Sequence, residues 1–141
     1  MPLHCIVYVS LANKEMSDQD LKGLLKAARN KNEKLNVTGL LLYRDGFFIQ
    51  ALEGEEDTID ALFDRISKDS RHRDVTTVYK KPIKQRAFPD WTMGFSRMDD
   101  AVLEKIDGYS DFLQNPTPGF FKATPSYAQA LLENFKADIF F

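Results

Sequence analysis

The sequence predicts an α+β fold, a ferredoxin-like β-α-β-β-α-β-β sandwich in which two helices cover one face of a sheet. Three observations predict it. Five short segments are rich in β-branched and aromatic residues, two longer segments repeat apolar residues at helical spacing, and the two kinds follow one another in the order of a split βαβ unit. Because crossover connections are right-handed, both helices should lie on one face, with the first and third strands as central neighbours.

The first strand is predicted over residues 3–9 (LHCIVYV) and the first helix over residues 17–34. Ser17 offers an N-cap, and acidic side chains in the first turn suit the helix dipole. Cys5, the only cysteine, falls inside the strand, where we interpret it as a buried thiol and not as a nucleophile. The inward stripe of the helix consists of Leu21, Leu24, Leu25, Ala28, Asn32 and Leu35.

The second and third strands are predicted over residues 40–43 and 47–52, after a helix break at residues 36–39. Asp45-Gly46 between them is typical of a hairpin, because glycine readily takes the positive φ that tight turns require. These two strands should therefore pair directly with each other.

A second helix follows the third strand, and two more strands are predicted over residues 75–79 and 91–95. The apolar positions that indicate the helix are Ile59, Leu62, Phe63 and Ile66. We interpret the acidic residues on either side of these elements as solvated caps and turns, namely Glu53, Glu55, Glu56, Asp57, Asp99 and Asp100.

The chain is expected to divide into one domain over residues 1–97 and a C-terminal helical extension over residues 98–141. A short helix fits residues 102–106, and the segment NPTPG at residues 115–119 is typical of a linker or turn. A last amphipathic helix is indicated by Tyr127, Leu131, Leu132 and Phe135. This extension holds too little apolar material for a core of its own, so we expect it to dock on the sheet or on another subunit.

Composition excludes several classes of protein. The chain of 141 residues is 43% hydrophobic and 28% charged, with a net charge of −2, and its basic residues are spread evenly, which argues against a nucleic-acid binder. No apolar run is long enough to span a bilayer and no signal sequence is visible, so a cytoplasmic location is expected. His4 and His72 are isolated, which predicts no metal site. Phosphate-binding glycine loops and a nucleophile elbow are absent, so no enzyme is supported.

Polar residues occupy three positions where apolar ones are expected. Tyr8 shares a strand face with Ile6, Gln50 shares one with Phe48, and Asn32 continues the inward stripe of the first helix. One interpretation is a structural hydrogen bond between a buried tyrosine and a buried glutamine. The other is a binding site for a planar heterocycle with imide edges, since amides both donate and accept hydrogen bonds. The residues alone leave both interpretations open.

Five segments in order resemble the BLUF family, the sensors of blue light using flavin, over residues 3 to about 97. They are LHCIVYVS, NKNEKLNVTGLLLY, DGFFIQALEGE, RISKDSRHRDV and FPDWTMGF. The resemblance implies that Tyr8 is the photoactive tyrosine, Gln50 the key glutamine and Asn32 a flavin anchor. It also implies that Trp91 and Met93 are switching residues. The full cofactor-binding set that it implies is Tyr8, Leu24, Ala28, Lys31, Asn32, Phe48, Gln50, Arg65, Ile66, Asp69 and His72, of which Arg65, Asp69 and His72 should lie near the outer edge and phosphates of the flavin.

Lys31 departs from the family pattern, because several relatives carry Asn-Asn where this chain has Lys31-Asn32. A lysine at this position can reach a flavin phosphate as a point charge or remain exposed to solvent, and the sequence leaves both open.

The resemblance implies a photoreceptor without a catalytic domain of its own. Blue light would drive electron and proton transfer from Tyr8 to an oxidised flavin, expected as FAD with FMN or riboflavin as alternatives, and would leave Gln50 rotated, tautomerised or both. The expected partners are the flavin, a separate effector protein and further copies of the chain. The rival hypotheses are a light-independent ferredoxin-like regulator that binds a small molecule, and a small hydrolase on the same fold.

Overall fold

The computed structural model describes residues 2–89, 92–97, 129–130 and 132. Seven elements follow in the order β1 (Leu3–Ala12), α1 (Asp18–Leu35), β2 (Thr38–Arg44), β3 (Phe47–Glu55), α2 (Glu56–Ser67), β4 (His72–Ile83) and β5 (Gly94–Arg97). The strands form one sheet in the order β4-β1-β3-β2-β5, in which only the β2–β5 pair is parallel. The α+β ferredoxin-like fold and the central pairing of β1 with β3 are confirmed.

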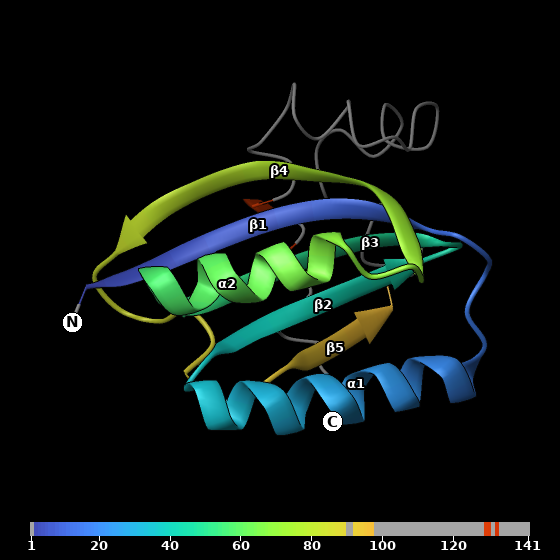
Figure 1. The fold of residues 1–141 in the computed structure, drawn as a ribbon, viewed down its shortest axis with the longest axis horizontal. Coiled ribbons are helices and arrows are strands. Elements are labelled where there is room, and N and C mark those ends of the chain that lie inside the picture. The colour runs from blue at the N-terminus through green and yellow to red at the C-terminus, as the bar shows by residue number, and fades with distance from the viewer. Residues whose placement is uncertain (1, 90–91, 98–128, 131, 133–141) are drawn as a thin grey trace.

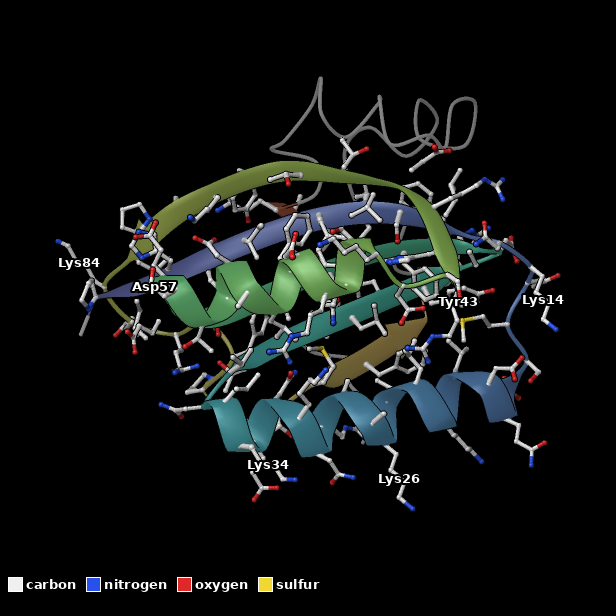
Figure 2. The ribbon with its side chains drawn as sticks, viewed as in Figure 1. Lys14, Lys26, Lys34, Tyr43, Asp57 and Lys84 are labelled. Atoms are coloured by element: carbon white, nitrogen blue, oxygen red, sulfur yellow. The ribbon has the colours of Figure 1, made fainter. Side chains whose placement is uncertain are left out.

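The local signals act as the sequence predicts. Ser17 caps α1 in a capping box with Asp20, and Asn36 ends the helix in the left-handed conformation with φ 55°. Asp45 and Gly46 form the β2–β3 turn with φ 46° and 84°, a backbone that glycine adopts without the usual steric cost. Side chains on the outer side of α1, such as Lys26, point away from the sheet (Figure 2).

All five strands have different bounds from those predicted: β1, β2 and β3 are each three residues longer, and β4 and β5 depart further. β4 runs over His72–Ile83, well beyond residues 75–79, because it pairs with β1 along its length while charged edge positions such as Lys80 obscure the pattern. β5 begins at Gly94, opposite Leu40, so Met93 lies before the strand. Residues 92 and 93 were predicted to belong to this strand, and that prediction was wrong. Trp91 lies outside the described residues.

The sheet separates two hydrophobic cores. Both helices cover the same face of the sheet (Figure 1). One core lies between this face and the helices, since Leu21 and Leu25 of α1 join Ile59 and Leu62 of α2 in the same cluster. The other covers the opposite face of the sheet and includes Cys5, Val7 and Ile49. Leu132 is 4% exposed in this second core, so the described part of the extension docks on the sheet as expected. The other helices expected between residues 98 and 141 lie outside the described residues.

Glu53 contradicts its prediction. It is 1% exposed at the end of β3, where its carboxylate accepts hydrogen bonds from the backbone N–H groups of Ala87 (2.7 Å) and Phe88 (3.0 Å) and from Thr38 Oγ1 (3.0 Å). Arg86 adds a bond to the Glu53 carbonyl at 2.9 Å. The solvated cap that we expected is instead a buried anchor for the chain that leads from β4 to β5. The same expectation for Asp99 and Asp100 falls outside the described residues.

Cys5 is a buried thiol as expected, and burial with the negative charge of Glu53 raises its pKa to about 12. Within the described part of the chain, no helix is both long and apolar enough to cross a membrane.

Candidate functional site

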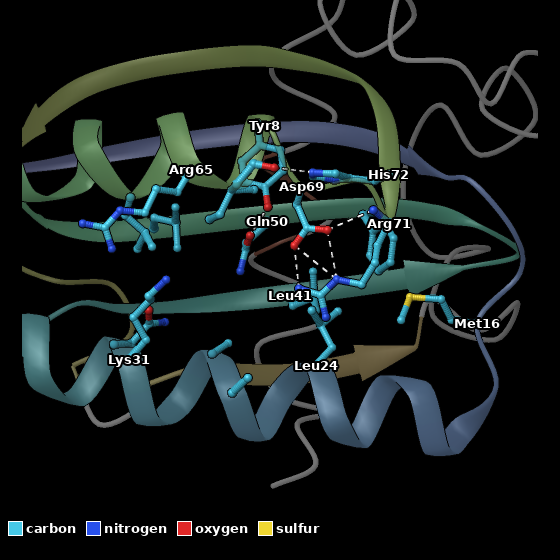
Figure 3. A pocket seen from close by; sticks show the side chains of 17 residues that line it. Tyr8, Met16, Leu24, Lys31, Leu41, Gln50, Arg65, Asp69, Arg71 and His72 are labelled. Carbon is cyan, nitrogen blue, oxygen red and sulfur yellow. Dashed lines mark hydrogen bonds and ion pairs between the residues drawn. The ribbon is translucent and has the colours of Figure 1, made fainter.

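A cavity of about 280 Å³ opens between α1, α2 and the sheet, close to the lower end of the range of roughly 300–1,000 Å³ for ligand pockets (Figure 3). Its walls contain every residue that the sequence predicted to bind a cofactor, from Tyr8 on β1 to His72 at the start of β4. Six further residues line it that the prediction missed, namely Met16, Ala27, Leu41, Leu52, Leu62 and Arg71. Of these, Leu52 shares a face of β3 with Gln50, a signal that alternation alone could have supplied, whereas Leu41 is opposite Gln50 through the register of β2 with β3.

Tyr8 and Gln50 stand directly opposite each other on β1 and β3. Both side chains are almost fully buried, and the hydroxyl of Tyr8 donates a hydrogen bond to Oε1 of Gln50. The amide nitrogen of Gln50 donates in turn to Sδ of Met93 at 3.4 Å, and Met93 is 1% exposed. The phenol, the amide and the thioether therefore form one hydrogen-bonded chain beside the cavity.

The surroundings of Tyr8 hold its hydroxyl in the protonated form. Burial raises the pKa of Tyr8 above its ordinary value, and the negative charge of Asp69 raises it further. The ring packs against Phe63 at a centroid distance of 5.3 Å and meets the ring of His72 edge-on at 6.5 Å. Tyr8 is therefore a fixed hydrogen-bond donor at neutral pH.

Asn32 reaches the site from the last turns of α1 and is 2% exposed. Its Nδ2 donates to the backbone carbonyl of Thr92 at 2.7 Å. A carboxamide carries two N–H donors and an acceptor oxygen, so Asn32 can bind the polar edge of a ligand while it holds Thr92. The inward orientation that the helical stripe predicted for Asn32 is confirmed.

An ion pair borders the cavity at the start of β4, where Arg71 Nη2 lies 2.6 Å from Asp69 Oδ2 (Figure 3). Hydrogen bonds from the Arg71 guanidinium lower the pKa of Asp69 to about 2, and the same contact raises the pKa of Arg71. His72 Nε2 lies 2.5 Å from the carbonyl of Ile66, and its Nδ1 lies 2.9 Å from Ser10 Oγ. In neutral His72 the proton therefore sits on Nε2, and Nδ1 accepts from Ser10.

Two exposed cations come from opposite helices at one end of the cavity, Lys31 on α1 and Arg65 on α2 (Figure 3). The cavity walls also include apolar side chains, among them those of Leu24, Ala28 and Phe48.

The donor set fits a flavin. Apolar walls suit the faces of a planar ring system, the amides of Asn32 and Gln50 suit an imide edge, and the two cations suit phosphate. No cluster of three potential metal-ligating side chains occurs among the residues with a described position. Trp91, the other predicted switching residue, lies outside those residues.

One protein family matches this sequence, described as BLUF, the sensors of blue light using FAD, over residues 3–94. Subunit beta of a photoactivated adenylate cyclase from Euglena longa is 42% identical over 92 residues, which are 64% of this chain and 11% of the relative. The corresponding subunit alpha from Euglena gracilis is 40% identical over 83 residues, or 59% of this chain and 8% of the relative. The chain therefore spans only a small part of the curated relatives it matches.

Solved structures of similar length resemble the chain as a whole. The dark-state structure of the BLUF protein BlrB superposes with a TM-score of 0.72 at 28% identity, over 92% of this chain and 96% of BlrB. The photo-activated state of BlsA superposes with a TM-score of 0.74 at 26% identity, over 93% of this chain and 92% of BlsA.

Proposed function

The chain belongs to the BLUF family of sensors of blue light using FAD, and on that premise we propose that flavin lies between α1 and α2 and that Tyr8 and Gln50 form the photochemical switch. The observation that carries this proposal is the buried hydrogen bond from Tyr8 to Gln50 in the wall of the cavity. When bound there, an oxidised flavin would supply absorption of blue light and acceptance of an electron, while the protein supplies placement.

Tyr8 holds the proton that the switch needs. Its hydroxyl is protonated, because burial raises its pKa, and it already donates to Oε1 of Gln50. On loss of an electron by the phenol, that proton can move along the existing hydrogen bond from Oη of Tyr8 to Oε1 of Gln50. For charge to balance, Nε2 of Gln50 must release a proton to the electron acceptor in the cavity, which makes Gln50 the imidic tautomer. Return of an electron and a proton to Tyr8 then leaves Gln50 as that tautomer or as a rotated amide, and either change exchanges a donor for an acceptor at the edge of the cavity.

Met93 favours one orientation of the Gln50 amide before illumination. In the observed orientation Oε1 accepts from Tyr8 and Nε2 donates to the thioether sulfur. Rotation would place Oε1 beside Sδ, and a thioether has no hydrogen to donate. The state with Oε1 toward Tyr8 is therefore the resting state, and the reversed amide is the strained one that must relax in the dark.

We assign the phosphates to the mouth of the cavity and FAD as the principal cofactor. Lys31 and Arg65 face this mouth from opposite helices, and their two positive charges match a diphosphate better than the uncharged end of riboflavin. FMN remains the nearest alternative, and heat-released cofactor separated by chromatography distinguishes the three.

The sensor signals to a separate effector protein and works as a homo-oligomer. BlrB and BlsA resemble the chain over more than nine tenths of their own length, whereas the chain matches only 11% of a photoactivated cyclase subunit. The packing of Leu132 against the sheet supports an output route through the face opposite the helices. No activity of its own is assigned to the chain.

One absorption experiment tests the proposal against a light-independent ferredoxin-like regulator. The purified protein should be yellow, should carry close to one flavin per chain, and should shift its absorption to the red after blue light. Colourless protein that does not take up added FAD would refute the flavin site. A yellow protein whose spectrum is unchanged by light would refute the switch alone.

A further inference from the structure

Arg29, which the sequence analysis did not single out, reaches from α1 to the segment before β5. Its Nε donates to the backbone carbonyl of Met93 at 2.9 Å. The neighbouring carbonyl, that of Thr92, receives Nδ2 of Asn32 at 2.7 Å. Two side chains less than one helical turn apart on α1 therefore hold two consecutive carbonyls ahead of β5, which is an edge strand of the sheet.

The Met93 side chain is closely packed at its end. A Cβ atom added to Gly39 on β2 would lie 3.3 Å from Cε of Met93, and Sδ accepts the hydrogen bond from Gln50. Small movements of the Met93 main chain therefore change the distance between Sδ and the Gln50 amide. Arg29 is placed to prevent them.

The placement of this arginine carries a cost in stability. Its Nη2 is buried, and the described residues offer it no hydrogen-bond acceptor. A buried guanidinium nitrogen without a partner lowers stability, and an apolar side chain of similar length would avoid that penalty. Arg29 also does not line the cavity, so it makes no direct contact with a ligand there.

We propose that Arg29 is a positioning residue for the photochemical switch, which holds the Met93 main chain so that Sδ stays on the Gln50 amide. This inference rests on the proposed function of Tyr8 and Gln50. Together with Asn32, which lines the cavity, Arg29 ties α1 to the chain that enters β5. Met93 then biases Gln50 toward its resting orientation only while Arg29 holds it.

Four variants separate this role from a general structural one. Arg29→Met keeps an unbranched side chain and removes the donor. Arg29→Gln places an N–H group the same number of bonds from Cα as Nε, so it should restore the contact. Arg29→Lys keeps the charge without a donor at that position and replaces Arg29→Met if that protein fails to fold. Lys26→Met changes an exposed residue one turn earlier on α1 and is the control (Figure 2).

The first measurement needs no photochemistry. In protein labelled at the methionine methyl carbons, the Met93 signal is assigned in the wild type and in each variant by its loss when Met93→Leu is added, which separates it from the new methionine of Arg29→Met and Lys26→Met. We expect Arg29→Met and Arg29→Lys to move this signal toward the position of a solvent-exposed methionine, and Arg29→Gln and Lys26→Met to leave it in place. An unmoved Met93 signal in Arg29→Met would overturn the proposal, whether or not the wild type responds to light.

The second measurement is the dark recovery of the red-shifted state in flavin-loaded protein. Release of Met93 removes the penalty on the reversed amide, so recovery in Arg29→Met should slow by about 2- to 10-fold, the range that one hydrogen bond implies. Arg29→Gln and Lys26→Met should recover at the wild-type rate with equal flavin content. An unchanged rate in Arg29→Met, or loss of flavin from it, would show that Arg29 acts otherwise. A wild type without a red shift would instead count against the proposed function.

Discussion

Tyr8 donates a hydrogen bond to Oε1 of Gln50 across the two central strands of the sheet, from a position 42 residues earlier in the chain. The pair exists because β1 and β3 are antiparallel neighbours in a register that places the two residues opposite each other on the face covered by the helices. A shift of one strand by one residue would turn one of the two side chains to the other face. The strand register therefore places Tyr8 and Gln50 within hydrogen-bonding distance of each other.

Removal of either partner should abolish the red shift while the flavin stays bound. Tyr8→Phe keeps the packing against Phe63 but lacks the hydroxyl proton, and Gln50→Leu lacks the amide. Difference absorption spectra before and after blue light check both variants. Tyr79→Phe, which removes a phenol on the opposite core, is the control and should keep the shift. A normal red shift in Tyr8→Phe or Gln50→Leu would contradict the assigned roles.

Asn32→Ala should weaken flavin binding because a polar edge of the ligand is left without its partner. The expected loss is about 1–3 kcal/mol, or roughly a 5- to 150-fold rise in Kd. Titration of flavin-free protein, followed by the quenching of flavin fluorescence, measures it. Asn30→Ala, an exposed amide on the same helix, should bind as the wild type does. If the two variants bind flavin with equal affinity, Asn32 does not contribute to flavin binding.

Glu53→Gln should destabilise the fold by about 1.5–3 kcal/mol, the range for hydrogen bonds to a charged group. The carboxylate accepts from two backbone N–H groups and a hydroxyl, whereas the amide of glutamine would turn N–H donors toward some of them. Urea unfolding gives the free energy of unfolding. Glu15→Gln, at an exposed position, should change it little. If both variants unfold at the same urea concentration, the Glu53 carboxylate does not stabilise the chain between β4 and β5.

Tyr8 should make stability fall at alkaline pH. In the unfolded chain its phenol titrates at about pH 10, whereas burial raises its pKa in the folded protein. The stability from this difference is fully present below pH 10 and is lost as pH rises toward the higher folded pKa, at up to about 1.4 kcal/mol per pH unit. The free energy of unfolding of the wild type above pH 10 should therefore fall more steeply than that of Tyr8→Phe. Parallel slopes would show that the folded Tyr8 titrates normally.

Light should change hydrogen exchange in the extension after β5, because β5 follows directly on Met93 and the extension docks on the sheet at Leu132. The hydrogen-exchange rates of peptides from residues 98–109 and of peptides around Leu132 should differ between the dark and the illuminated protein. Exchange followed by mass spectrometry makes the comparison, and Gln50→Leu, which cannot switch, should show no difference. Changes confined to residues 1–95 would place the output elsewhere.

Local sequence patterns predict the elements of the fold and mark the polar residues at the centre of the site. Strand and helix periods locate β1, α1, β2, β3 and α2 because each is set by neighbours a few residues away. The same periods expose Tyr8, Gln50 and Asn32 as polar residues in apolar stripes. The sequence also predicted that the extension would dock, and Leu132 does so.

Which polar groups meet across long stretches of chain depends instead on the packed fold. Glu53 binds backbone groups 34 and 35 residues away, and Arg29 reaches a carbonyl 64 residues away. Arg71 lines the cavity through a turn, where no periodicity marks a face. The burial of Glu53 depends on the path of a distant loop and on where the backbone donors of that loop point. No pattern of neighbouring residues encodes that path, so these contacts follow from the packed fold alone.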